Sequence, residues 1–378
     1  MVKRIAFRLL VRETELKTGT ELKLNTAVNR NQRKTAPVFV LGSPRSGTTL
    51  LYDMLLSAGG FAVYLAESNV FNLLAPRFGS LVVRENRRKL LHAWQGSKLF
   101  RASGLNSQLI EKKVLEECRS AGDFLRLVMS EIARAQGMQR WAENSPEGVL
   151  HLPTIKRQIP DALVIHIIRD GRDVALSLAR LKYVRPFPWE ERQSLISAGV
   201  YWEWIVEHGR RYGHLLGPDY LEVHFENLIA SPQETLNKIG EFIDQGLDYD
   251  RIRQVAYGSV SQPNTSFKTE SPGTGFSPVG RWKKGFSPHE LLRFERMLGK
   301  TLEELGYAPS MPGSSEGMNL EMKATRLIHR SYFVGKLLFK RNWLVRTLRP
   351  ALTSAEIDAT VLADDHATEI KAVSSQFS

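Results

Sequence analysis

The segment from Gly42 to Thr49 has the residue spacing of a loop that binds a phosphate or sulfate group. The pattern Gly42-x-x-x-x-Gly47-x-Thr49 is that of a Walker A loop, which turns backbone N–H groups and a helix N-terminus toward an anion. Thr48 stands where a nucleotide triphosphatase has its lysine, and the cation of this loop is Arg45 instead. The segment therefore predicts an anion site, and the missing lysine argues against an ATPase.

A second segment, from Arg169 to Ser177, predicts another anion site. Its sequence RDGRDVALS follows an apolar run, so Arg169 is expected at the end of a buried strand, where ligands of open α/β sheets bind. Ser177 lies one helical turn beyond Asp173, within reach of the same anion. Taken alone, the segment has an alternative interpretation as a capped helix with surface ion pairs. Together with the first loop, it indicates one ligand with two separated anionic groups.

The residues around these segments predict the elements that position them. From Val38 to about Tyr307, short apolar runs alternate with helical patterns, which is typical of an α/β fold with a mostly parallel sheet. Residues 263–284 are rich in Gly, Pro, Ser and Thr and are expected to form a long loop. Buried strands are expected at 38–41, 162–168 and 220–228, and helices at about 48–57, 83–95, 107–118, 123–136, 173–181, 232–242 and after Ser287-Pro288.

Four motifs, in order along the chain, resemble those of sulfotransferases that use 3′-phosphoadenosine 5′-phosphosulfate (PAPS), closest to the bacterial and protein-tyrosine branches. Pro44 to Leu50 is similar to the family's loop for the 5′-phosphosulfate. Arg169 and Ser177 match the pair that holds the 3′-phosphate. The stretch YLEVHFENL, from Tyr220, resembles a family strand, and GRWKKGFSPHEL, from Gly280, resembles the loop that closes over the nucleotide.

The resemblance implies that these motifs hold the donor. Arg45, the N–H groups after it, and the hydroxyls of Thr48 and Thr49 would stabilise charge on the leaving phosphate, a task that suits the bidentate guanidinium. Phe225 replaces the tyrosine of the strand motif, so it keeps a ring for stacking on adenine and lacks the hydroxyl. Trp282 would either stack on the adenine or anchor its loop. The residues expected to bind the donor are Pro44, Arg45, Ser46, Gly47, Thr48, Thr49, Arg169, Ser177, Phe225, Ser266, Lys268, Arg281, Trp282 and Lys283.

The acceptor hydroxyl needs a base, and Glu67 is the candidate. It follows the loop arginine by an interval similar to that of the catalytic glutamate in the protein-tyrosine branch, and a carboxylate there would take the proton. A surface or ion-paired glutamate is the alternative. His92 is a weaker candidate for the base, whereas His151 and His166 are expected to be structural.

Asn144 departs from the pattern of the family. The family often has W-x-E-K-[TS]-P, and the segment WAENSP that ends at Pro146 places Asn144 where that lysine would neutralise the transferring sulfate. Asparagine donates a hydrogen bond without a charge. A lost charge-assisted bond costs about 1.5–3 kcal/mol unless another residue, such as a lysine of the late loop, replaces it. We expect Arg45, Glu67 and Asn144 to form the catalytic centre.

Composition narrows the kinds of partner. A net charge of +12 over 378 residues favours anionic ligands or surfaces. Nucleic acid is not expected as a partner, because the net charge is the only feature of the sequence that favours it. The single cysteine, Cys118, excludes an intramolecular disulfide and a multi-cysteine zinc site. Sulfuryl transfer proceeds without a metal that bridges two phosphates, so no metal is expected.

Three regions are expected: a basic N-terminal flank at 1–34, a sulfotransferase domain at 35–308, and a basic amphipathic C-terminal extension with a tail at 309–378. The stretch from Met318 to Arg349 combines basic and aromatic residues, which suits a helix on an anionic membrane, one packed on a partner, or a helix pair docked on the domain. No apolar run reaches the roughly 18 residues of a membrane span. We expect a cytoplasmic protein, with a peripheral contact at an anionic membrane as the alternative.

These features predict a P-loop-like three-layer α/β/α sulfotransferase with a mostly parallel sheet and a helical C-terminal extension. It would transfer a sulfuryl group in line from PAPS to a hydroxyl of a sugar, lipid or small alcohol, with Glu67 as base and Arg45 on the leaving phosphate. Residues 181–204 and 71–101 are expected to line the acceptor pocket. The alternatives are a non-catalytic nucleotide-binding or membrane-docking module and, with less support, a P-loop kinase.

Overall fold

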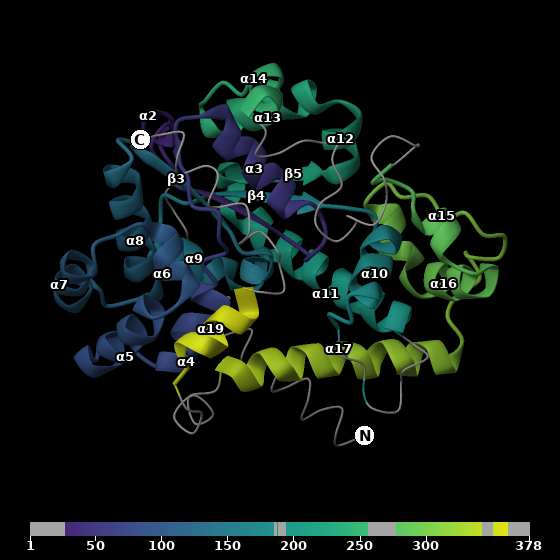
Figure 1. Cartoon of the computed structure of the whole chain (residues 1–378). Coiled ribbons are helices and arrows are strands. Elements are labelled where there is room, and N and C mark those ends of the chain that lie inside the picture. The colour runs from purple at the N-terminus through teal and green to yellow at the C-terminus, as the bar shows by residue number, and fades with distance from the viewer. Residues whose placement is uncertain (1–26, 185–186, 188–193, 256–276, 342–350, 362–378) are drawn as a thin grey trace.

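The computed structural model describes residues 27–184, 187, 194–255, 277–341 and 351–361 (Figure 1). At its centre lies a five-stranded sheet in the order β2-β3-β1-β4-β5, in which every pair of neighbouring strands is parallel. The predicted α/β fold with a mostly parallel sheet is confirmed. The strands are β1 (Val38–Gly42), β2 (Phe61–Ala62), β3 (Arg140–Asn144), β4 (Leu163–Ile168) and β5 (Tyr220–His224).

The helices lie close to the ranges that the sequence predicts. The last long helix of the predicted domain, α16, begins with Pro288, and the Ser287 hydroxyl accepts the backbone N–H of Glu290 at 3.3 Å. The helical segments are α2 (Arg30–Arg33), α3 (Thr48–Ala58), η1 (Val70–Leu74), α4 (Ala75–Phe78), α5 (Arg84–Gln95), α6 (Lys98–Ser103), α7 (Ser107–Glu117), α8 (Ala121–Ala135), η2 (Pro146–His151), α9 (Leu152–Gln158), α10 (Gly171–Arg180), α11 (Ser194–Gly213), η4 (His214–Asp219), α12 (Phe225–Ala230), α13 (Pro232–Ile243), α14 (Tyr249–Val255), α15 (Trp282–Gly285), α16 (Pro288–Glu304), α17 (Leu320–Arg341) and α19 (Ser354–Val361).

Helices cover both faces of the sheet, so the fold has three α/β/α layers (Figure 1). Val38 and Val40 of β1 belong to one buried cluster, which also contains residues of α3 and α13. Phe39 and Leu41 point to the opposite face and belong to a second cluster, with residues of α8 and α11. A parallel sheet that is covered on both faces explains why β1 is apolar at every position.

Two predicted boundaries are wrong. The strand expected at 220–228 ends at His224, because α12 begins at Phe225. The Glu226 carboxylate accepts the backbone N–H of Asp170 at 2.9 Å, which holds this turn beside the end of β4. The loop expected at 263–284 contains the short helix α15, and its residues 263–276 lie outside the described part of the chain.

The basic helix α17 is docked on the domain. This arrangement is one of the alternatives that the sequence predicts for the stretch from Met318 to Arg349. In Figure 1 it runs along the lower side of the molecule. Phe333 is buried and stacks on Trp204 of α11 with ring centroids 5.9 Å apart. The guanidinium of Arg326 lies 2.9 Å from the Glu203 carboxylate, and His329 lies 2.7 Å from the Ser197 hydroxyl. Among the described helices, none combines the length and apolar character needed to cross a membrane.

Protonation of His166 in the middle of β4 is expected to destabilise the fold. This side chain is fully buried, its Nδ1 lies 2.6 Å from the Tyr220 hydroxyl, and burial lowers its pKa from 6.5 to about 4. The native state therefore holds the neutral ring, and stability is lost as the pH falls from the unfolded pKa toward the folded one. The loss reaches about 3 kcal/mol in total, at roughly 1.4 kcal/mol for each unit of pKa shift.

Urea unfolding at a series of pH values between neutral and about 4 checks this expectation for His166. The variant His166→Phe should lose much of the acid-dependent decline in the free energy of unfolding. His92 is exposed on α5, so His92→Phe is the matched control and should keep the wild-type slope. A wild-type slope in His166→Phe would contradict the assignment.

Candidate active site

The loop between β1 and α3 has a backbone shape that its glycines permit. Gly47, which precedes α3, has a φ of 95°, and a Cβ atom there would lie 2.3 Å from the Phe225 ring. A Cβ on Gly42 would lie 2.5 Å from the carbonyl oxygen of Ile167 on β4. Arg45 also lies in the left-handed region, with a φ of 71°, a conformation that costs free energy for a residue with a side chain. The sequence of the loop is therefore fitted to this compact turn.

The start of α3 offers unpaired groups to an anion. The helix begins at Thr48 without a side-chain cap, so its first N–H groups and the positive end of its dipole face the loop. The Ser46 side chain is buried, and its Oγ has no hydrogen-bond partner among the described residues. An oxyanion at this position would satisfy these donors, so the residues present fit a phosphate or sulfate group. Pro44 and Thr48 are buried in the same turn, and Thr49 is half-buried.

The two predicted anion segments meet at the carboxyl ends of β1 and β4. Arg45 donates from Nε to the Ser177 hydroxyl of α10 at 3.1 Å. Arg169, directly after β4, donates from Nη1 to the backbone carbonyl of Arg45 at 3.1 Å. Residues that are more than a hundred positions apart in the chain thus form one cluster. Its two guanidinium groups and one hydroxyl can hold a ligand with more than one anionic group.

Arg169 is placed by contacts on several sides. Its guanidinium carbon lies 4.4 Å from the centroid of the Phe225 ring, and it lies 3.6 Å from the Asp173 carboxylate. It also donates to the backbone carbonyl of Pro278. The side chain is buried, which lowers the pKa of Arg169, and its Nε lacks a hydrogen-bond partner within the described ranges. A buried cation with an unpaired donor is suited to bind an anion.

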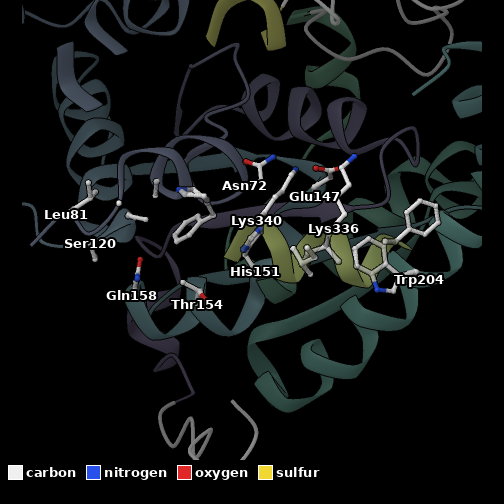
Figure 2. Close-up of a pocket in the computed structure, with 18 of the residues that line it drawn as sticks. Asn72, Leu81, Ser120, Glu147, His151, Thr154, Gln158, Trp204, Lys336 and Lys340 are labelled. Carbon is white, nitrogen blue, oxygen red and sulfur yellow. The ribbon is translucent and has the colours of Figure 1, made fainter. Parts of the chain in front are cut away.

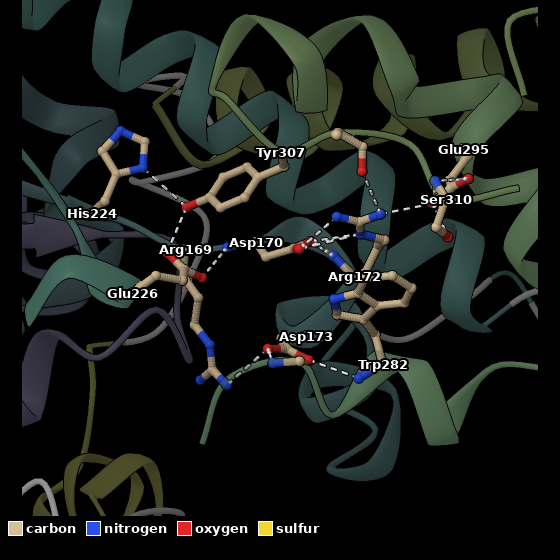
Figure 3. Close-up of polar contacts among 12 residues, drawn as sticks. Arg169, Asp170, Arg172, Asp173, His224, Glu226, Trp282, Glu295, Tyr307 and Ser310 are labelled. Atoms are coloured by element: carbon tan, nitrogen blue, oxygen red, sulfur yellow. Dashed lines mark hydrogen bonds and ion pairs between the residues drawn. The ribbon is translucent and has the colours of Figure 1, made fainter. Parts of the chain in front are cut away.

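Asp173 ties the late loop to this cluster (Figure 3). Its carboxylate accepts the backbone N–H groups of Gly280 and Trp282, each at 2.8 Å. The Trp282 ring is buried and lies 3.9 Å from the guanidinium carbon of Arg172, so here it anchors the loop. Arg281 lies between Gly280 and Trp282 in the sequence and is half-buried. Lys283 is exposed on α15, and Ser266 and Lys268 lie outside the described residues.

The second arginine of the RDGRD segment has a structural role. Arg172 is buried, and it pairs with the carboxylates of Asp170 at 2.8 Å and Glu295 at 2.7 Å (Figure 3). Glu295 in turn accepts the backbone N–H groups of Ser310 at 3.0 Å and Met311 at 2.9 Å. These contacts join α10, α16 and the segment after α16. They fix the helix that presents Ser177 without using Arg172 for a ligand.

Glu67 and Asn144 lie on two segments that a buried carboxylate joins. Glu143 of β3 accepts the Ser68 hydroxyl at 2.6 Å and also the Ser145 hydroxyl. The Ser145 hydroxyl accepts the backbone N–H of Asn69 at 3.2 Å. Burial raises the pKa of Glu143, and the two serine hydrogen bonds oppose that shift. These hydrogen bonds around Glu143 therefore fix the segment that carries Glu67 beside the carboxyl end of β3.

Glu67 itself is half-buried, directly before the segment that Glu143 holds. Asn144 is the last residue of β3 and is buried, and its Oδ1 is without a hydrogen-bond partner in the described part of the chain. The Asn144 Oδ1 can therefore accept a hydrogen bond from a ligand. The sequence predicts a catalytic role for both residues, and the structure adds the Glu143 link between their segments.

A cavity of about 660 Å³ lies next to these segments (Figure 2). Asn72 and Glu147, which follow Glu67 and Asn144 by only a few residues, are part of its wall. The predicted ranges 181–204 and 71–101 contribute in part. The lining residues include Phe71, Asn72, Ala75, Pro76, Leu81, Arg119, Ser120, Glu147, His151, Thr154, Gln158, Tyr183, Val184, Tyr201, Trp204, Tyr332, Phe333, Lys336 and Lys340.

Sequence reasoning missed several of these lining residues. Glu147 and His151 follow the WAENSP motif within two helical turns. This proximity to a motif could have indicated that they lie near the site. His151 was expected to be structural, and the structure places it in the cavity wall. Lys336 and Lys340 come from α17, about 190 residues further along the chain, and no local pattern indicated that they reach this wall.

No cluster of three or more metal-ligating His, Cys, Asp or Glu side chains occurs among the residues that the structure describes. The donors at the loop and at α10 are guanidinium, hydroxyl and N–H groups, all of which suit an anion. The fold and this cluster together define a phosphate-loop α/β protein with two cationic side chains at one sheet edge.

The sequence matches the model of the sulfotransferase family over residues 37–250, which is more than half of the chain. The chain therefore belongs to the sulfotransferase family. This confirms the predicted family.

Curated relatives and solved structures are similar to the chain at low identity. A Caenorhabditis briggsae protein, provisionally named a protein-tyrosine sulfotransferase, is 27% identical over 55% of this chain, and the chain spans 65% of that protein's length. Protein-tyrosine sulfotransferase A of Caenorhabditis elegans is 23% identical over 79% of this chain and 75% of its own length. The sulfotransferase domain from the curacin biosynthetic pathway aligns with 73% of this chain and 98% of its own, at 16% identity and a TM-score of 0.49.

Proposed function

We propose that this chain transfers the sulfuryl group of PAPS in line to the hydroxyl of a small acceptor molecule. The observation that carries the proposal is the contact of the two anion segments, in which Arg45 bonds Ser177 and Arg169 bonds the backbone of Arg45. A donor with a phosphosulfate at one end and a 3′-phosphate on the ribose needs two cationic positions on one sheet edge.

The residues of the loop would hold the 5′-phosphosulfate. The N–H groups at the start of α3, the Ser46 hydroxyl and the Arg45 guanidinium would converge where negative charge develops on the leaving phosphate oxygen. Arg169 and Ser177 would hold the 3′-phosphate. Phe225 lies beside Gly47 and Arg169, where an adenine ring has an aromatic surface available.

Glu67 would take the proton of the acceptor hydroxyl as its oxygen attacks sulfur. Asn144 would donate a hydrogen bond to a sulfuryl oxygen from a buried position. The cavity beyond these two residues is the proposed acceptor site, because its wall begins on the same two segments. Residues 35–308 would form the catalytic domain, and the C-terminal extension would complete the acceptor site through α17.

Glu143 is expected to act as a positioning residue for Glu67. The variant Glu143→Ala would leave the hydroxyls of Ser68 and Ser145 without their acceptor and should lower kcat about tenfold or more, since small displacements of reacting groups are costly. Glu143→Gln keeps an accepting oxygen and should recover most of the activity. Steady-state kinetics with calorimetry of adenosine 3′,5′-bisphosphate (PAP) binding check this: kcat should fall while PAP affinity stays unchanged. Equal loss in both variants, or a loss confined to PAP binding, would contradict the role.

Transfer of radiolabelled sulfate from PAPS tests the proposed function directly. The assay would use a panel of phenols, alcohols, glycans, lipids and tyrosine peptides, in the presence of a chelator. Label should pass to a small hydroxyl compound with the wild-type chain, and much less with Arg45→Ala and Glu67→Ala. Donor binding without transfer to any acceptor would favour a non-catalytic nucleotide-binding module, a reading that Asn144 in place of lysine supports. Absence of donor binding would overturn the proposal.

A further inference from the structure

We propose that the acceptor is a small amphiphile that carries an anionic group in addition to its hydroxyl, and that α17 recognises this anionic group. The inference rests on the proposed function, because it names the substrate class of the same site. It follows from the charge of the cavity, from the apolar character of its walls, and from an unpaired polar atom close to the reaction centre.

The charge of the cavity wall favours an anion. Lys336 and Lys340 lie one helical turn apart on α17, so both project toward the same side of that helix. In Figure 2 their side chains extend from α17 toward the wall that carries Asn72 and Glu147. Arg119, next to α8, adds a third cationic side chain to the lining.

The negatively charged group of the described lining is hydrogen-bonded to two tyrosine hydroxyls. Among the described residues that line the cavity, Glu147 is the one carboxylate. It accepts the Tyr183 hydroxyl at 3.3 Å and the Tyr201 hydroxyl as well. The described lining thus has three cationic side chains and one carboxylate, so the sign of its charge favours an acceptor with a carboxylate, sulfate or phosphate group.

Aromatic residues form the other part of the wall. Tyr201 and Trp204 of α11 pack against Phe333 of α17, with ring centroids 5.1 Å and 5.9 Å from that of Phe333. Phe71 and Tyr332 also line the cavity. A volume of about 660 Å³ is in the usual range for a small-molecule site. The body of the acceptor should thus be apolar, with the anionic group at its end.

Asn72 connects the cavity wall to the segment that carries Glu67. The Asn72 Nδ2 donates to Asn69 Oδ1 at 2.9 Å, which places it on the segment that Glu143 holds beside Glu67. Asn72 Oδ1 is buried and has no hydrogen-bond partner in the described ranges. This oxygen can accept a hydrogen bond from the acceptor hydroxyl as the acceptor binds, before the hydroxyl proton passes to Glu67. A hydroxyl at Asn72 and an anion at α17 would orient an elongated acceptor across the cavity.

Matched acceptor pairs that differ in charge alone test the inference. One pair is para-hydroxyphenylpropionate and its amide, and the other is an omega-hydroxy fatty acid and its amide. Affinity for the PAP-loaded protein would be measured by calorimetry, and turnover by transfer of radiolabelled sulfate. Each carboxylate should bind about five- to tenfold tighter than its amide, as an ion pair close to solvent allows. Added salt should reduce this preference.

Substitutions on α17 should remove the preference. The double variant Lys336→Ala/Lys340→Ala should bind the carboxylates about as weakly as the amides, with unchanged affinity for the amides and for PAP. Lys336→Arg keeps the charge and should keep the preference. Lys323 is exposed on the same helix and does not line the cavity, so Lys323→Ala is the matched control.

The outcomes separate this inference from the proposed function. Equal affinity for carboxylates and amides, or a preference that persists in the double variant, would overturn the inference even if sulfate is transferred. Sulfation of a tyrosine peptide in preference to every small acceptor would also overturn it. Selective binding of the carboxylates through Lys336 and Lys340 without any sulfate transfer would support the anion site and refute the proposed function.

Discussion

Arg45→Ala is expected to lower kcat about 100- to 1,000-fold, the size of effect seen when one donor to a developing oxyanion is removed. Arg45 is the cation of a strained loop that adopts a left-handed backbone conformation, and it bonds Ser177 at 3.1 Å, so its guanidinium is fixed before a ligand arrives. Such a preorganised donor stabilises charge on the leaving phosphate without reorganisation. The measurement is single-turnover sulfate transfer at saturating PAPS.

Two further variants make the Arg45 result specific. Arg45→Lys keeps the charge but loses the bidentate geometry, and it should fall between wild type and Arg45→Ala. Arg157 is exposed on α9, so Arg157→Ala is the matched control and should transfer sulfate at the wild-type rate. A loss in Arg45→Ala that appears only as weaker PAPS binding, with full kcat at saturation, would show that Arg45 binds the ground state and does not act on the transition state.

Glu67→Gln is expected to lower kcat by about two to four orders of magnitude, the usual range for removal of a general base. The amide has nearly the same shape as the carboxylate, so PAP affinity and acceptor affinity should change little. The rate of transfer should also lose its decline at acid pH, because that decline reports protonation of the base. Transfer rates at saturating substrate over a range of pH provide the measurement.

The control for Glu67 is Glu116→Gln, at an exposed position on α7. It should keep both the rate and the pH profile of the wild type. A Glu67→Gln enzyme with a wild-type rate would assign the proton transfer to another group, and His151 in the cavity wall would be the next residue to test. A reduced rate that still declines at acid pH as in the wild type would indicate that Glu67 positions the acceptor.

The loops and helix starts of the proposed donor site could be predicted from the sequence because their signals are local. The loop at Arg45 and the segment at Arg169 each combine an apolar strand, a turn and a helix start within about fifteen residues, and a parallel sheet brings such strand ends to one edge. The prediction for Trp282 left open whether it stacks on adenine or anchors its loop. The contact with Arg172 places the ring in the anchoring role in this structure.

Strand β3 was not predicted, because its sequence contains charged residues that are not typical of a buried strand. Arg140 and Glu143 are both buried in it, although charged residues usually mark the surface. Their partners explain the burial: Arg140 donates to the backbone carbonyls of Ala36 at 2.8 Å and Ile243 at 3.0 Å, and Glu143 accepts two serine hydroxyls. These partners are distant in sequence or have no recognisable pattern, so a local reading cannot supply them.

Helix α17 follows the sheet and its covering layers in the chain, yet two of its lysines and Phe333 form part of the wall of the proposed acceptor cavity. The cluster at the loop and α10 is built by strands and helices that precede it. Part of the acceptor choice would then be encoded in a later stretch of the gene than the donor chemistry. Recombination or point mutation confined to the later stretch would change which compounds are sulfated while the donor site keeps its sequence, so relatives with similar loops are expected to differ most in this helix.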